Sequence, residues 1–328
     1  MRRIAVGFMV LLLGLAVLLA SGEPQADPRL KNAFRRAPQN GWIFVHLEGT
    51  PAAIGFQHGY LLAPEIQDAQ KVTALELTHD NQKDWQFFRS AAKEILWPRI
   101  EQEYREELQG IADGLNARGV KLDLWDVVAM NASLEWGYYV KEYDRQHKVA
   151  SPPLPTPERC SAFVATGSYT RDGKIVMAHN SWTLYLDGER WTVIFDVKPE
   201  KGHRFIMDGY PGLIHSADDF GINAAGIMIT ETTISQFAGW DSNGIAGFAR
   251  ARKAMQYSAS IDDFARAVQN KAADAEMAGR LSFAAAAGHA CGIHFKAADH
   301  LRRHPEFGWQ AGLLRDMNAH PWTTFSAH

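Results

Sequence analysis

The stretch that decides how this chain is interpreted is Cys160-Ser161-Ala162-Phe163-Val164-Ala165-Thr166, followed by a turn at Asp172-Gly173 and by Ala178-His179-Asn180-Ser181-Trp182. Apolar and β-branched residues dominate both stretches and turn-forming residues separate them, which is typical of two strands joined by a turn. Strands connected in this way lie side by side. We therefore expect Cys160 and the segment 179–182 to meet at one edge of a sheet.

A proline-rich segment lies just before Cys160. Residues 151–157 contain four prolines in seven positions, so this segment is expected to be extended, exposed and accessible to cleavage. A cut between Arg159 and Cys160 would leave a thiol and an α-amine on one residue. That amine titrates near neutral pH and can take the thiol proton, so the thiolate can attack an ester or amide carbonyl. The alternative is that Cys160 is a small buried apolar residue where a strand starts.

The pattern of the chain changes at this linker. Before it we expect a strand at 42–49 and then helices, with a helix start at Pro51 and further helices at 101–115 and 122–139. Gly55 and Gly59 share one helix face, which predicts a close helix contact. After the linker we expect strands at 162–166, 175–178, 191–197 and 227–233, and helices at 245–256 and 261–268.

The N-terminus has the pattern of a signal peptide. Arg2 and Arg3 precede an apolar run at 4–20, and small residues follow at 20–22. An uncleaved membrane anchor is the alternative. Either interpretation predicts an exported protein, located in a periplasm, outside the cell or in a lysosome-like lumen.

Composition excludes several classes of protein. The chain has 328 residues, 46% of them hydrophobic, and a formal net charge of -3. Nucleic-acid binding normally requires a clear basic excess, so a nucleic-acid partner is not expected. Two cysteines are too few for a disulfide scaffold. The spacing of His289, Cys291, His294, His300 and His304 matches no standard zinc site, and we expect neither a metal nor a cofactor.

The two stretches around Cys160 and His179 resemble the phospholipase B-like family of cysteine N-terminal-nucleophile (Ntn) hydrolases, which are related to penicillin-acyltransferase-like proteins. Glu48-Gly49-Thr50-Pro51 through Gly55-Phe56-Gln57-His58-Gly59 is similar to the opening helix of that family. Further similar segments are Tyr210-Pro211-Gly212, Asp218-Asp219-Phe220 and Thr230-Glu231-Thr232-Thr233. Ser181 stands where the family has Thr.

The resemblance implies roles for individual residues. Cys160 would be the catalytic nucleophile and Arg159-Cys160 the cleavage site, with His179 orienting or protonating groups near the thiolate. Asn180 would donate to the oxyanion and Trp182 would wall the pocket. The alternatives are a hydrogen-bonded strand-end histidine, a turn-capping asparagine and a tryptophan of the core. Substrate binding would fall to Tyr210, Asp218, Thr230, Glu231 and Thr232.

The resemblance also implies a fold, an α+β Ntn-hydrolase αββα sandwich preceded by a helical segment. We expect a signal peptide at 1–22, a helical part at 23–150, the linker at 151–159 and the catalytic β-rich part at 160–270. Residues 271–328 are a divergent tail with no convincing strand pattern, which suggests that the fold is truncated at the C-terminus and the sheet incomplete.

The implied reaction is hydrolysis of an acyl ester or amide of a small molecule, such as a phospholipid. One alternative is an amidase or acyltransferase of the penicillin-acyltransferase-like group. The other is an inactive truncated homologue. The oligomeric state does not follow from the sequence.

Overall fold

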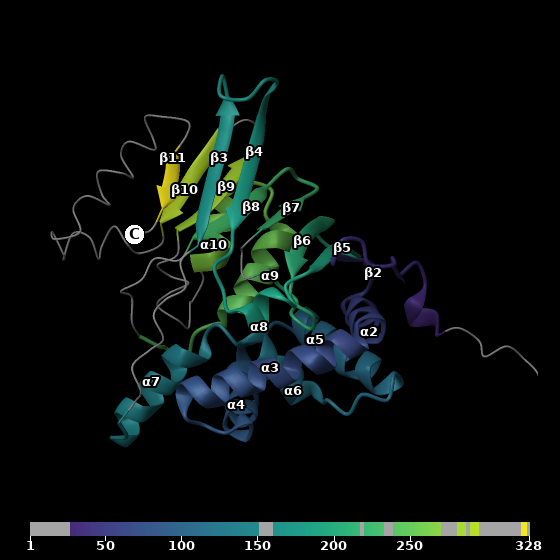
Figure 1. The fold of residues 1–328 in the computed structure, drawn as a ribbon, viewed down its shortest axis with the longest axis vertical. Helices are drawn as coiled ribbons and strands as arrows, with labels where there is room; N and C mark the ends of the chain where they lie inside the picture. Colours follow the sequence, from purple (N-terminus) through teal and green to yellow (C-terminus); the bar gives the residue numbers. More distant parts are fainter. Residues whose placement is uncertain are drawn as a thin grey trace, which may run out of the picture.

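The computed structural model describes residues 27–150, 160–216, 220–232, 239–269, 281–286, 289–294 and 323–326, with side chains described up to Thr230 and for 239–268. The predicted signal peptide, the linker with Arg159, and Asp218 lie outside these residues. The described residues form a mixed α+β fold (Figure 1).

Most of the helices precede the linker, as predicted. Their bounds are η1 Pro28–Leu30, α2 Pro51–Leu61, α3 Ala63–Asn81, α4 Trp85–Ala91, η2 Ala92–Leu96, η3 Trp97–Arg99, α5 Gln102–Ala117, α6 Leu124–Asn131, α7 Trp136–His147, α8 Tyr185–Gly188, α9 Gly247–Tyr257 and α10 Ile261–Gln269. The predicted start at Pro51 is confirmed. The Thr50 hydroxyl accepts a hydrogen bond from the Ala53 amide at 3.2 Å, and Pro51 occupies the first turn, where no amide proton is needed.

The single helix predicted at 122–139 is wrong, because the chain breaks it into α6 and α7. Polar side chains at the break bind other parts of the chain. Asn131 donates to the Gly212 carbonyl and accepts from the Ile214 amide, at 2.9 and 2.8 Å. The carboxylate of Glu135 accepts the amide protons of Gly247 and Phe248, the first two residues of α9. Periodicity alone does not reveal these distant partners.

The predicted close contact at Gly55 and Gly59 is confirmed, and α5 supplies the opposing face. A Cβ on Gly55 would lie 1.9 Å from the Glu107 carbonyl oxygen, and one on Gly59 would lie 2.1 Å from that of Ile111. Gly114 of α5 is equally tight, 2.2 Å from the Phe56 carbonyl oxygen. The backbones of α2 and α5 therefore touch, which only glycine permits.

The strands form two sheets. Their bounds are β1 Phe34–Arg35, β2 Ile43–Gly49, β3 Ser161–Gly167, β4 Gly173–Asn180, β5 Val193–Pro199, β6 Phe205–Gly209, β7 Phe220–Asn223, β8 Met228–Thr232, β9 Leu281–Ala286, β10 His289–His294 and β11 Thr323–Ser326. One sheet has the order β1-β2-β5-β6-β7-β8-β9-β10 and the other β11-β3-β4. The predicted strands correspond to β2, β3, β4, β5 and β8, whereas β1, β6 and β7 were not predicted.

The large sheet is mixed. β2 and β5 are parallel, with Val45 opposite Phe195, and the other pairings within it are antiparallel. This parallel pair joins the part of the chain before the linker to the part after it. Since β2 lies between β1 and β5, the part of the chain before the linker shares the large sheet with the part after it.

The tail showed no convincing strand pattern in the sequence, yet its described residues include three strands. β9 pairs with β8, β10 with β9, and β11 with β3, all antiparallel. The sheet therefore continues beyond β8. Alanine-rich sequence such as 284–286 hides a strand because alanine has little strand propensity of its own.

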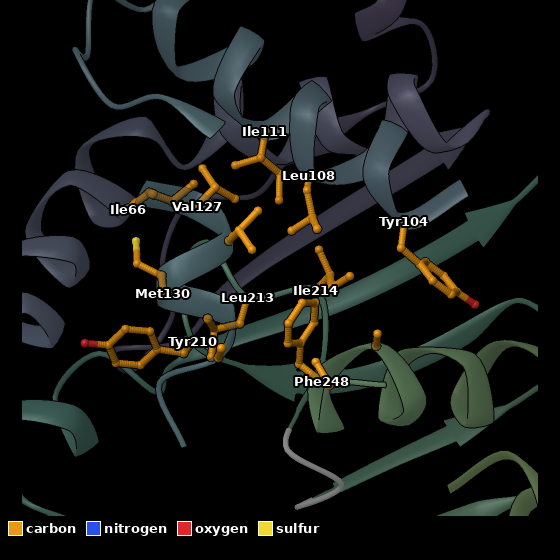
Figure 2. Packing of buried hydrophobic residues seen from close by; sticks show 14 of the residues in the cluster. Ile66, Tyr104, Leu108, Ile111, Val127, Met130, Tyr210, Leu213, Ile214 and Phe248 are labelled. Atoms are coloured by element: carbon orange, nitrogen blue, oxygen red, sulfur yellow. The ribbon is translucent and has the colours of Figure 1, made fainter. Parts of the chain in front are cut away.

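The two faces of the large sheet are covered differently. On one face Asn223 donates to the Met255 carbonyl of α9 at 3.0 Å, and Phe195 and Phe205 join the main core. Figure 2 shows this core where residues of α5 and α6 meet Leu213 and Ile214. The β3–β4 hairpin contacts β8, and because α9 takes the first face, the hairpin covers the second. The described residues thus form a helical layer, a large sheet and a second sheet.

No helix among the residues described here is both long and apolar enough to span a bilayer.

Candidate functional site

Cys160 lies where the second sheet begins. It directly precedes β3, is half-buried and is not part of a disulfide bond. In the register of β3 with β4, Ser161 lies opposite Asn180 and Ala162 opposite His179. The expected meeting of the two strand ends is therefore confirmed, and Cys160 stands beside the end of β4.

Alternation along the hairpin separates an inner face from an outer one. Ala162, Val164 and Met177 are buried, whereas Phe163 and Val176 are 40% and 47% exposed. Cross-strand partners point to the same face of a sheet. His179, the partner of Ala162, therefore belongs to the inner face, toward the large sheet.

His179 has a buried Nε2 atom, and its Nδ1 atom lies 3.3 Å from the hydroxyl of Ser181. This contact fixes the orientation of the imidazole ring. Asn180 is the next residue of β4 and lies opposite Ser161. Its side chain is exposed and belongs to the outer face. The two polar residues predicted to serve the thiolate thus lie at the same strand end but on opposite faces.

Trp182 is 68% exposed, so its alternative assignment to the core is wrong. It lies in the loop between β4 and α8, and Leu184 and Tyr185 after it are 52% and 92% exposed. Two contacts anchor α8 and the residues after it to α3: Asp187 is hydrogen-bonded to Glu76, and Arg190 pairs with Asp68 at 2.7 Å. Burial raises the pKa of Asp187, which favours a proton shared between the two carboxyl groups.

Of the predicted substrate-binding residues, Tyr210 is not brought to this edge. It is 3% exposed, and its hydroxyl donates to the Ala69 carbonyl in α3 at 3.5 Å. Its ring packs on Trp191, 5.6 Å between centroids, and burial raises the pKa of the phenol. Tyr210 thus belongs to the interface between α3 and the sheet.

Thr230 is placed differently. It lies in β8, is fully buried, and its hydroxyl has no hydrogen-bond partner. It pairs with Phe220, on the face that the hairpin covers. Glu231 and Thr232 continue β8, but their side chains, like Asp218 and Arg159, lie outside the described residues.

Sequence reasoning missed Asp208, near the end of β6. Its Oδ1 atom is buried without a hydrogen-bond partner, and burial raises its pKa to about 7. The only signal was a lone acidic residue in the apolar run Phe205-Ile206-Met207-Asp208, in a strand that was itself not predicted.

No group of His, Cys, Asp and Glu among the described residues could hold a metal ion. The histidines of the tail, weighed as zinc ligands from the sequence, fall outside the described side chains.

The fold and the site together define a class of mixed α+β proteins. In this class a cysteine, here Cys160, directly precedes a strand, and a histidine, here His179, lies opposite the start of that strand. The sequence profile of the phospholipase B family matches residues 54–240, more than half of the 328 residues. The chain therefore belongs to the phospholipase B family.

Parts of the chain are also similar to individual proteins. An uncharacterised protein of Archaeoglobus fulgidus is 26% identical over 273 residues, which are 78% of this chain and 44% of that protein. Phospholipase B-like 3 of Caenorhabditis elegans is 37% identical over 91 residues, 26% of this chain and 15% of the relative. Phospholipase B-like 2 of Rattus norvegicus is 30% identical over 98 residues, 27% of this chain and 16% of the relative. The aligned regions span less than half the length of each relative.

Proposed function

We propose that this protein is an exported Ntn hydrolase that cleaves acyl esters or amides of small molecules, phospholipids being the favoured class, with Cys160 as its nucleophile. The observation that carries the proposal is the position of Cys160: half-buried, at the start of β3 and beside the end of β4 that bears His179. Membership of the phospholipase B family supports the choice of substrate class.

The mechanism requires a cut between Arg159 and Cys160. The new α-amine of Cys160 then accepts the thiol proton, and the thiolate attacks the carbonyl carbon. The tetrahedral adduct collapses to a thioester as its bond to the alcohol or amine breaks, and this leaving group takes the proton back from the α-ammonium group. Water, deprotonated by the same amine, hydrolyses the thioester and restores the thiol. An N–H donor beside the thiolate would stabilise the oxyanion in each step.

The position of Cys160 is also compatible with a packing role, so the test must measure the reactivity of its thiol. The protein is expressed with Cys291→Ala, which leaves Cys160 as its single thiol. Intact-mass measurement and N-terminal sequencing are expected to show a fragment that begins with Cys160. Thiol alkylation is expected to abolish release of fatty acid from phosphatidylcholine. An uncut chain, or turnover that survives alkylation, would overturn the proposal.

Cys160→Ala and Ser161→Ala form a matched pair of neighbouring variants. The first is expected to stop both cleavage and turnover, and the second to leave both in place. Phospholipids, N-acyl amino acids and penicillins, assayed side by side, separate the phospholipase from an amidase or acyltransferase of the penicillin-acyltransferase-like group. Cleavage without turnover on any of them would indicate an inactive homologue.

A further inference from the structure

Asp208 and Thr230 share one row across the large sheet. Ile206 lies opposite Ile222, so Asp208, two residues on, lies opposite Phe220, and Phe220 pairs with Thr230. Residues in one cross-strand row point to the same face. Two inter-strand spacings separate the backbones of Asp208 and Thr230, roughly 10 Å.

This row lies on the face of the large sheet opposite α9, where the β3–β4 hairpin packs against β8; on the same face Ile206 and Ile222 are 40% and 37% exposed. His179 points toward the same space from the hairpin. In Figure 1 the start of β3 and the end of β4 lie at the end of the hairpin nearer to α8, and β5 begins close to α8 as well. The beginning of β5 is where β6 ends, with Ile194 opposite Asp208. The row and Cys160 therefore lie at the same end of the two sheets.

Two oxygens in this row lack partners, Oδ1 of Asp208 and the hydroxyl of Thr230. Buried polar atoms in proteins are nearly always hydrogen-bonded, and exceptions are often explained by a missing ligand. If these two positions served packing alone, Val or Leu would fill them without leaving a buried polar atom unsatisfied. A polar ligand between the sheets would satisfy them.

Among the described residues, no charged group contributes to the raised pKa of Asp208. Within the same part of the chain, the charged groups on adjacent elements include Asp196 of β5, bound by Arg204 and His46, Lys198 of β5, paired with Glu48, and Asp187 of α8, bound to Glu76. From the inner face of β4 the hairpin presents His179. The pKa of Asp208 is raised by burial, and only a hydrogen bond from its own backbone opposes this. A protonated carboxyl group is a hydrogen-bond donor, as a carboxylate is not.

Resting on the function proposed above, we propose that Asp208 is a substrate-binding residue whose protonated carboxyl donates a hydrogen bond to the carbonyl oxygen of the acyl substrate, with the Thr230 hydroxyl as a second contact. The site then selects an uncharged acceptor oxygen. Ionisation of Asp208 removes the donor and places a negative charge beside that oxygen, so binding weakens.

The first test is the pH profile of kcat/KM between pH 5 and 9, with released fatty acid measured by chromatography. The wild-type value is expected to fall above pH about 7. Asp208→Asn keeps a donor of the same shape and is expected to remove this fall, whereas Asp208→Ala is expected to raise KM roughly tenfold at pH 6. Asp172→Asn, in the exposed β3–β4 turn, is the control and keeps the wild-type profile. An unchanged fall in Asp208→Asn would overturn the proposal.

The second test does not require turnover, so it separates failure of this proposal from failure of the proposed function. Infrared difference spectra of the wild type and Asp208→Asn report the protonated carboxyl directly, and its band is expected to disappear with a midpoint near pH 7. Adding 2-undecanone, an uncharged carbonyl compound that cannot be hydrolysed, is expected to raise that midpoint. A midpoint that does not move with the ketone, in folded protein, rejects Asp208 as a carbonyl-binding group.

Discussion

The backbone amide of Gly212 donates a hydrogen bond to Nε2 of His58, 3.0 Å away, and so ties the loop after β6 to α2. His58 is 2% exposed, and burial, with a smaller contribution from the charge of Arg252, lowers its pKa to about 3. The imidazole is therefore neutral near pH 7, with its acceptor nitrogen toward Gly212. The motif that the sequence placed in an opening helix is thus part of the core.

This histidine makes the stability of the protein depend on pH. An unfolded histidine titrates near pH 6.5 and His58 near 3, so between these values the unfolded chain binds a proton that the folded chain does not. The contribution of His58 to the free energy of unfolding is therefore expected to fall as pH drops below 6.5, by roughly 2–3 kcal/mol at pH 4.5. Urea unfolding at several pH values measures it. His58→Gln should flatten this slope, and His79→Gln, whose parent side chain is 81% exposed, should not.

The contribution of Asp208 to stability depends on pH in the opposite direction. An unfolded aspartate titrates near pH 4 and Asp208 near 7, so between these values only the folded chain holds the proton. Its contribution to stability is full below pH 4 and declines as pH rises to about 7, by a few kcal/mol at about 1.4 per pKa unit. The unfolding free energy of Asp208→Asn minus that of the wild type is expected to be larger at pH 8 than at pH 4. Urea unfolding at the two pH values measures this difference. Equal pH slopes for the two proteins would refute this.

Local pattern was sufficient for elements whose stability is local. The helix start at Pro51 and the turn at Asp172-Gly173 each fix a structure through near neighbours, and both were predicted. β6, which holds Asp208, was not predicted, because a five-residue strand in the centre of a sheet is defined by its partners β5 and β7. The strand ends at Cys160 were placed correctly because one short turn joins them.

The roles of side chains were harder to predict than their elements. Tyr210 lies in a segment similar to the family pattern, yet its phenol faces α3. A motif reports that a residue matters without saying whether it binds a substrate or holds the fold. Asn131 shows the same limit, since its contacts with Gly212 and Ile214 join positions more than 80 residues apart.

The close contact between α2 and α5 predicts that adding a single methyl group there lowers the unfolding free energy strongly. Gly55→Ala would place a Cβ 1.9 Å from the Glu107 carbonyl oxygen, which forces the two helices apart. The expected loss is about 1–3 kcal/mol or more of unfolding free energy, as for other overpacked cores. Gly188→Ala is the control, because its Cβ would meet nothing closer than a Thr183 methyl at 3.6 Å. Similar urea midpoints for both variants would contradict the close contact.

Arg252 and Glu107 form an ion pair between α9 and α5, with side chains 2% and 5% exposed and 2.9 Å between their atoms. Removing one partner leaves a buried charge, so Arg252→Met is expected to cost roughly 3–5 kcal/mol. The double variant Arg252→Met with Glu107→Leu should recover much of this loss. Thermal unfolding of the two single variants and the double variant tests the coupling. Additive losses would show that the two groups act independently.

The parallel pairing of β2 with β5 has a consequence for a chain cut before Cys160. Two polypeptides would then be interwoven through a common set of main-chain hydrogen bonds, and native mass would not reveal the break. Gel filtration would return one species, and only a denaturing gel would resolve two bands. Purification through a tag on either fragment would also recover the other.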